Sequence, residues 1–141
     1  ELEERVKVEA PQLLEMPGCG PMSAARIVAE TGDPARFKSA AAFAMFTGCA
    51  PIPASSGNSQ RVRLNRGGNR RMNAALHRIA ITQKRMHPPA QDYLAARRAL
   101  GNSNTEAIRA LKRHLARRVF TLLRNRDAAT TAIRPVAGLA A

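Results

Sequence analysis

Two adjacent serines and a glycine, Ser55, Ser56 and Gly57, precede a run of arginines near the middle of the chain. A serine hydroxyl is a poor nucleophile until its proton can leave, and a phosphoryl transition state needs cations near its non-bridging oxygens. The glycine permits a nucleic-acid strand to approach the backbone closely. These residue types suit phosphoryl transfer, although most Ser-Ser-Gly triplets only form turns or caps. The arginines within residues 61–71 are Arg61, Arg63, Arg66, Arg70 and Arg71.

The charge distribution favours a polyanionic partner. The 141-residue chain has a formal net charge of +13, and residues 1–60 contain five Lys or Arg against seven Asp or Glu, so the positive charge lies in residues 61–141. A surface this basic attracts phosphate backbones, so nucleic acid is the first candidate and an anionic membrane the second. One tyrosine and four phenylalanines are too few for a single-strand stacking platform, which favours contact with a duplex backbone or a structured RNA.

No segment approaches the run of about 20 apolar residues that crosses a bilayer, and the first ten residues are too acidic for a signal peptide. We therefore expect a cytoplasmic protein without a membrane partner. The chain starts without methionine and within a helical pattern, which indicates a fragment of a longer protein.

Helical periodicity dominates the sequence, so we predict a mainly α, compact helical domain over residues 1–126. Residues 49–68 are rich in proline, glycine and small polar residues, which predicts an ordered loop or a short β-hairpin there. Residues 127–141 lack periodicity, and we expect a loose C-terminal tail. The predicted helices are 1–16 with a break at Pro11, 22–32, 40–46, 69–87, 90–100 and 104–125.

The long predicted helix over 69–87 has a cationic side. Two sets of basic residues recur every seven positions and form neighbouring stripes at 3.6 residues per turn. We expect Arg61 to Arg85 to form one continuous positive surface that binds nucleic acid. The first stripe is Arg71, Arg78 and Arg85, the second is Arg70, His77 and Lys84, and the apolar side is Met72, Ala75, Leu76, Ile79 and Met86.

Residues 12–32 have the pattern of a helix-hairpin-helix motif. Gly18 and Gly20 separate an apolar helix from an alanine-rich one, so their amides and the second helix's N-terminus could face a DNA phosphate. A turn that only packs the two helices together is the other reading, and the scarcity of positive charge in this segment favours it.

The stretch from about Leu13 to Asn125 resembles the C-terminal domain of the insertion-sequence transposases that carry an N-terminal RuvC-like DEDD domain, a group described as bridge-RNA-guided recombinases. It departs from the family pattern at Gly67 and Gly68, where one glycine is usual, and at Cys19, where an aliphatic residue is usual. The matching motifs, in chain order, are Pro17–Gly20, Gly32–Phe37, Gly48–Pro51, Ser56–Gly57 and Arg66–Arg71.

The resemblance implies that Ser56 is the nucleophile that attacks a DNA phosphodiester and becomes covalently joined to the strand. It also implies a divalent metal such as Mg²⁺ held by the absent N-terminal domain, a guide RNA, and a homo-oligomer whose composite site combines the serine of one protomer with the carboxylates of another. The isolated fragment would then be inactive, and the resemblance also implies a bacterial protein. In this chain Cys19 and Cys49 lack metal-ligand spacing and sit in apolar contexts, so we expect buried thiols and no metal.

The sequence is also compatible with a second class of function. A helix-hairpin-helix followed by basic helices could hold DNA or structured RNA without any chemistry. The orientation of Ser56 relative to an arginine-lined groove would separate this binding module from a transposase fragment that cuts and joins DNA strands.

Overall fold

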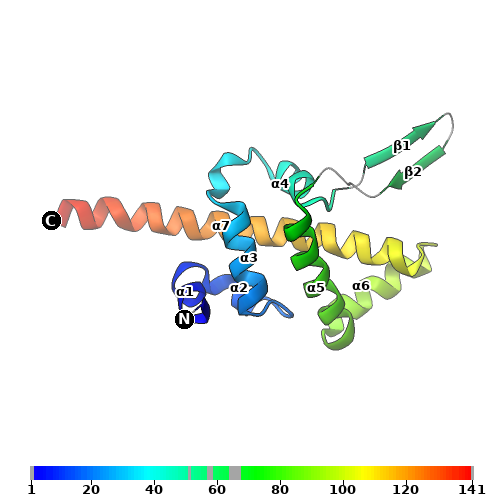
Figure 1. Ribbon diagram of the computed structural model, residues 1–141, viewed down its shortest axis with the longest axis horizontal. Coiled ribbons are helices and arrows are strands. Elements are labelled where there is room, and N and C mark those ends of the chain that lie inside the picture. Colours follow the sequence, from blue (N-terminus) through cyan, green and yellow to red (C-terminus); the bar gives the residue numbers. More distant parts are fainter. Residues whose placement is uncertain (1, 51, 57–58, 64–67, 141) are drawn as a thin grey trace.

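The computed structural model describes the backbone of residues 2–50, 52–56, 59–63 and 68–140, and the side chains of residues 3–50 and 68–125. Within these ranges the protein is mainly α-helical with one antiparallel two-stranded sheet, as predicted (Figure 1). The elements are α1 (Leu2–Glu9), α2 (Pro11–Glu15), α3 (Pro21–Thr31), the 3₁₀ helix η1 (Pro34–Arg36), α4 (Ala40–Thr47), β1 (Ile52–Ser56), β2 (Ser59–Arg63), α5 (Arg70–Met86), α6 (Pro88–Ala99) and α7 (Asn104–Ala140).

Local signals set most helix ends. The Ser39 hydroxyl accepts a hydrogen bond from the Ala42 N–H at 3.1 Å and caps α4, and Gly48 closes the same helix with φ 76°, a left-handed conformation that suits glycine. Gly32 ends α3 with φ 65°. These boundaries agree with the sequence prediction because each depends on residues adjacent in the chain.

The last helix differs from the prediction at its C-terminal end. The predicted capping box is present, since the Ser103 N–H donates to Glu106 Oε1 at 3.0 Å and the Glu106 N–H donates to the Ser103 hydroxyl at 3.1 Å. The helix does not end near Asn125 but continues to Ala140, and Figure 1 shows this last part extending beyond the other helices. Apolar periodicity reports packing against a core, and the segment beyond Asn125 lacks this periodicity, so the sequence pattern did not predict its helix.

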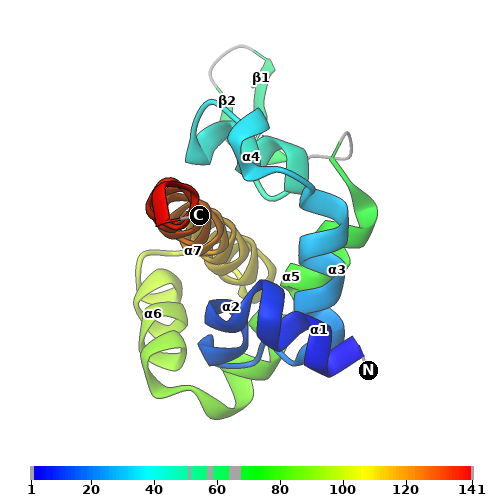
Figure 2. The ribbon, with the colours of Figure 1, turned by 90° about the vertical axis from the view of Figure 1, so that its left-hand side faces the viewer.

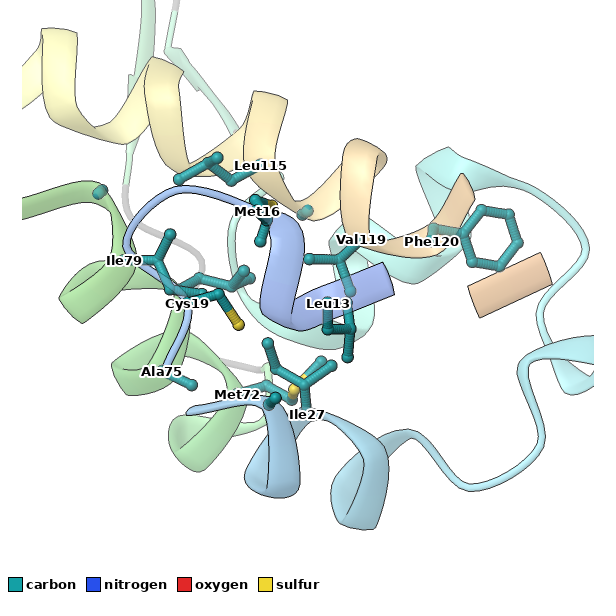
Figure 3. Close-up of a cluster of buried hydrophobic side chains, with 14 of the residues drawn as sticks. Leu13, Met16, Cys19, Ile27, Met72, Ala75, Ile79, Leu115, Val119 and Phe120 are labelled. Carbon is teal, nitrogen blue, oxygen red and sulfur yellow. The ribbon is translucent and has the colours of Figure 1, made fainter. Parts of the chain in front are cut away.

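α7 lies at the centre of the fold. It contacts α2, η1, α4, α5 and α6, and the view along its axis in Figure 2 shows the other helices arranged around it. Leu115 and Val119 of α7 lie in the cluster of Figure 3 together with residues of α2, α3 and α5, and Phe120 of α7 stacks on Phe43 of α4. The largest fully buried side chains outside α7 include Leu13, Ile27, Phe43, Met72, Leu76, Ile79 and Leu94.

All four phenylalanines of the chain belong to this core. Phe43 is fully buried and lies between Phe37, edge-on at 5.2 Å, and Phe120, stacked at 5.2 Å. Phe46 lies 5.0 Å from Phe37, and the Arg36 guanidinium covers both of these rings at 4.4 and 4.8 Å. The phenylalanine rings are therefore engaged in packing.

The apolar side of α5 agrees with the predicted stripe except at one end. Met72, Leu76 and Ile79 are completely buried, whereas Met86 is 63% exposed. Met86 is the last residue of α5, so the helix has already left the core when it reaches this position. No helix in the described part of the chain is long and apolar enough to cross a membrane.

Replacement of Phe43 by alanine should lower the free energy of unfolding by about 3–5 kcal/mol, because a fully buried ring leaves a cavity between α4 and α7. Met86→Ala on the exposed end of α5 is the control and should change it by less than about 0.5 kcal/mol. Denaturant unfolding monitored by circular dichroism measures both. Equal effects of the two substitutions would contradict the assignment of Phe43 to the centre of the core.

Candidate nucleic-acid interface

The candidate nucleophile Ser56 is the last residue of β1. The strands pair antiparallel with Ser56 opposite Ser59, Ala54 opposite Arg61, and Ile52 opposite Arg63. Cross-strand partners share a face of a sheet and alternate residues along a strand share it too. The register therefore assigns Ser56, Arg61 and Arg63 to one face of the hairpin. Ser55, which pairs with Gln60, belongs to the other face; Gly57 and Arg66 lie outside the described residues.

Two glycines meet at the base of this hairpin. A Cβ atom on Gly68 would overlap the Cα and N atoms of Gly48, so the chain leaves α4 and returns to α5 at nearly one point. The Asn69 N–H donates to the Phe46 carbonyl at 2.7 Å, and Asn73 Nδ2 donates to the Gly48 carbonyl at 3.2 Å. These bonds fix the base of the hairpin to the first turn of α5.

An open groove of about 1000 Å³ starts at this base and follows α5. Gly68 and Asn73 line its end near the hairpin, and none of its described lining residues is acidic. We call it the basic groove because its charged and titratable lining residues are Arg70, His77, Arg78 and Arg85 of α5 and Lys112 of α7. Its shape and charge suit a phosphate backbone.

Lys112 forms part of the floor of the basic groove and is only 7% exposed. Its ammonium donates a hydrogen bond to Asn73 Oδ1, so Asn73 links Lys112 to the Gly48 carbonyl. Burial lowers the pKa of Lys112, and nearby Arg109 lowers it further, while Cys49 has the opposite effect. Burial and Lys112 together lower the pKa of His77.

The basic groove is lined by residues of both predicted basic stripes. Arg70, Arg78 and Arg85 line the basic groove, whereas Arg71 does not. Arg71 Nη1 instead lies 3.4 Å from Glu30 Oε1, and Glu30 also accepts a hydrogen bond from Asn69 Nδ2 at 3.0 Å. The bond from Asn69, followed by Arg71, lowers the pKa of Glu30. Arg71 therefore has an acidic partner that the groove arginines lack among the described residues.

The turn at Pro17 to Gly20 contacts α5. Gly18 has φ 83°, and a Cβ there would lie 3.0 Å from the Ile79 carbonyl oxygen. Gln83 Nε2 donates to the Pro17 carbonyl at 2.7 Å. Packing thus explains the glycine at position 18. Gly20 differs, because it is exposed, caps α3 and has nothing within 4 Å of an added Cβ.

The start of α3 nevertheless lies close to the basic groove. A smaller hollow is lined by Met22 and Arg26 of α3 together with Ala74 and Arg78 of α5, and the last two residues also line the basic groove. Arg26 extends the positive surface from α5 towards α3. The sequence prediction missed Arg26, which stands alone among apolar neighbours in its helix.

The sequence analysis also did not identify Lys112 and Asn73 as candidate site residues. Lys112 comes four residues after Ile108 and three before Leu115, so helical spacing places it on the apolar stripe of α7. A lysine on an apolar stripe is a signal that could have identified Lys112, because buried lysines need a partner or a function.

Among the described residues no group of three His, Cys, Asp or Glu could hold a metal ion.

The thiols are free in the structure, with Cys19 buried and Cys49 half-buried, as predicted. Burial raises the pKa of Cys19 to about 11. Burial also raises the pKa of Cys49, against smaller opposite effects of the Thr47 hydrogen bond and Lys112. Both thiols therefore keep their protons at neutral pH.

Comparison with known proteins shows that this sequence is similar to proteins of insertion elements. A model of the transposase IS116/IS110/IS902 family matches residues 10–95. An uncharacterized 43.6 kDa protein of insertion element IS110 from Streptomyces coelicolor is 34% identical over 117 residues, 82% of this chain and 29% of the relative. An uncharacterized 42 kDa protein of insertion element IS900 from Mycobacterium paratuberculosis is 34% identical over 115 residues, 80% of this chain and 29% of the relative. The chain thus spans less than a third of the length of these relatives.

The two glycines of the turn should respond differently to alanine. Gly18→Ala should destabilise the fold by about 1–3 kcal/mol, because a Cβ at positive φ also presses on α5. Gly20→Ala should leave the free energy of unfolding within about 0.5 kcal/mol of the parent value.

A bulky residue at Gly20 should reduce duplex binding with unchanged helical content if the turn faces phosphate. Unfolding of that Gly20 variant would instead show that the turn serves packing alone.

Arg78→Ala should weaken binding to duplex DNA and reduce the salt dependence of log K by about one unit of slope, the amount expected for one lost phosphate contact. Arg71→Ala is the matched control and should reduce the slope less, because Glu30 already pairs with this side chain. Fluorescence anisotropy over a series of salt concentrations measures both. An unchanged slope for Arg78→Ala would remove the basic groove from the interface.

Proposed function

Because the chain belongs to the IS116/IS110/IS902 transposase family, we propose that it is the part of a transposase that binds DNA and carries the serine nucleophile for strand cleavage and joining. The relatives are products of insertion elements, which makes DNA the expected partner. The catalytic residue in this proposal is Ser56, and the nucleic-acid ligands are the cations of the hairpin and of the basic groove.

The position of Ser56 is the observation that carries the proposal. The register groups it with Arg61 and Arg63 on one face of the hairpin, and the base of that hairpin meets the basic groove at Gly68. A strand bound along the groove would continue towards the hairpin. Phosphodiesters would then lie near a hydroxyl and two guanidinium groups, which is the combination that the reaction needs.

The proposed chemistry is a phosphoryl transfer. The oxygen of Ser56 forms a bond to the phosphorus of a DNA phosphodiester and loses its proton, while the bond from phosphorus to the leaving deoxyribose oxygen breaks and that oxygen gains a proton. The guanidinium groups of Arg61 and Arg63 stabilise charge on the non-bridging oxygens. Attack by a second strand's hydroxyl on the phosphoserine then joins the strands and restores the serine.

The described residues of this chain do not fit a catalytic metal site, since they contain no cluster of carboxylates, histidines or cysteines. In the proposal a divalent metal such as Mg²⁺ is held by the DEDD domain that the family resemblance implies, and it would stabilise charge on the reacting phosphate. The same resemblance leads us to propose a guide RNA as a second partner. It also leads us to propose a homo-oligomer in which Ser56 of one protomer meets the carboxylates of another.

A non-catalytic binding module is the second candidate. The basic groove, its Lys112–Asn73 link and the packed Pro17–Gly20 turn are complete without any contribution from Ser56. A helix-hairpin-helix module that binds DNA or RNA would use these features unchanged. The two candidates therefore predict the same groove variants to be defective in binding and differ only at the serine.

Ser56→Ala should abolish strand cleavage and the covalent protein–DNA adduct in the intact transposase with its metal-binding domain and guide present, because the nucleophile is lost. Binding and folding should remain close to the parent values. Ser55→Ala is the matched control, since Ser55 pairs with Gln60 and belongs to the opposite face; we expect a milder effect. Gel assays of strand transfer and mass spectrometry of trapped adducts measure these outcomes.

Attachment of the strand to Ser55, Ser59 or Tyr93 would contradict the assignment of Ser56. Tyr93 stacks on the His114 ring at a centroid distance of 5.6 Å, so it would need to leave that contact to act. Full strand transfer by Ser56→Ala, with binding intact, would leave the binding module as the function of this chain.

A further inference from the structure

Lys112 is a buried cation without an acidic partner in the described part of the chain. Among the described residues its ammonium makes one hydrogen bond, to the neutral Asn73 side chain, although an ammonium has three protons to donate. Buried charges in proteins are normally paired, because desolvation of an unpaired charge is costly. The fold therefore retains a cation where an apolar residue would pack at lower cost.

The groups around Lys112 cannot supply the missing negative charge. The Cys49 thiol raises the pKa of Lys112, but burial keeps that thiol protonated at neutral pH. Arg109 is a like charge and acts in the opposite direction. Lys112 also disfavours the cationic form of His77, and a neutral imidazole carries no negative charge. The counter-charge must come from outside the described chain.

The open side of Lys112 is the basic groove. Arg70 and Arg78 line the same groove, so an anion bound in it has guanidinium groups as well as the ammonium available as ligands. The non-bridging oxygens of a phosphodiester can accept hydrogen bonds from several such donors at once. The groove is open, which allows a polymer to lie along it with one phosphate directed inwards.

We propose that Lys112 binds one backbone phosphate of nucleic acid at the floor of the basic groove, with Arg70 and Arg78 as the other ligands of this phosphate subsite. This inference rests on the proposed function and assigns a residue and a ligand group within it. Asn73 joins Lys112 to the Gly48 carbonyl at the base of the hairpin. The phosphate subsite therefore lies close to the junction of α4 and α5 between which the hairpin that bears Ser56 is inserted.

The test compares Lys112→Met with Lys38→Met in the complete chain. Both substitutions remove one lysine charge and keep a linear side chain, but Lys38 is exposed and is not among the groove residues. The probes are a short DNA duplex, an RNA duplex of the same sequence, and inorganic phosphate. Thermal unfolding is followed with and without phosphate, and duplex affinity is measured over a range of salt concentrations.

Lys112→Met should unfold at the same temperature as the parent or higher, since it removes a buried unpaired charge, and water in the groove can replace the donor that Asn73 loses. It should nevertheless reduce the salt slope of duplex binding by about one unit. Phosphate should raise the unfolding temperature of the parent and of Lys38→Met more than that of Lys112→Met. A purely structural lysine would not give equal or greater stability together with weaker binding.

Several results would overturn the inference. Parallel losses of stability and binding in Lys112→Met would make Lys112 a structural residue, and unchanged affinity and slope would leave the phosphate subsite without a ligand. A loss confined to one duplex would keep the phosphate subsite and assign its phosphate to DNA or to RNA. Strand transfer by Ser56→Ala would defeat the proposed nucleophile but leave the slope result intact, so the two failures are distinguishable. Absence of binding of either duplex and of phosphate to the parent chain would defeat both.

Discussion

The burial of one side of α7 is the interaction on which the rest of the structure depends. α7 contacts α2, η1, α4, α5 and α6, and Val119 lies fully buried at the centre of these contacts. Burial of this apolar surface supplies the dominant favourable term in folding. It also fixes α5 beside α7, and only that arrangement brings Lys112 of one helix to the groove formed along the other. The candidate interface is therefore a direct product of the core.

Local features of the fold were predictable from sequence because they depend on neighbouring residues. The cap of α4 by Ser39 and its end at Gly48 follow from side chains and conformations within a few positions. The extent of α7 was not predictable in the same way. Its last part has no apolar repeat to read, so the sequence pattern indicated a tail where the structure has helix.

The candidate site was predictable in composition but not in arrangement. The charge change after residue 60 and the serine beside the arginines pointed to this region, and the roles of Ser56 and of the individual arginines stay predictions. The pairing of Arg71 with Glu30 and the link from Lys112 through Asn73 to Gly48 join residues distant in the chain. Tertiary packing creates such contacts, and periodicity along one helix does not reveal them.

Gly48 and Gly68 lie in contact, so the segment between them is inserted into the helical body at a single point. Because its two ends coincide, residues can be added to or removed from it without separating α4 from α5, and the entropic cost of a longer loop grows only slowly. The helical body and the hairpin that contains Ser56 are thus structurally separable. The helical scaffold therefore sets no fixed length for the segment inserted at this junction.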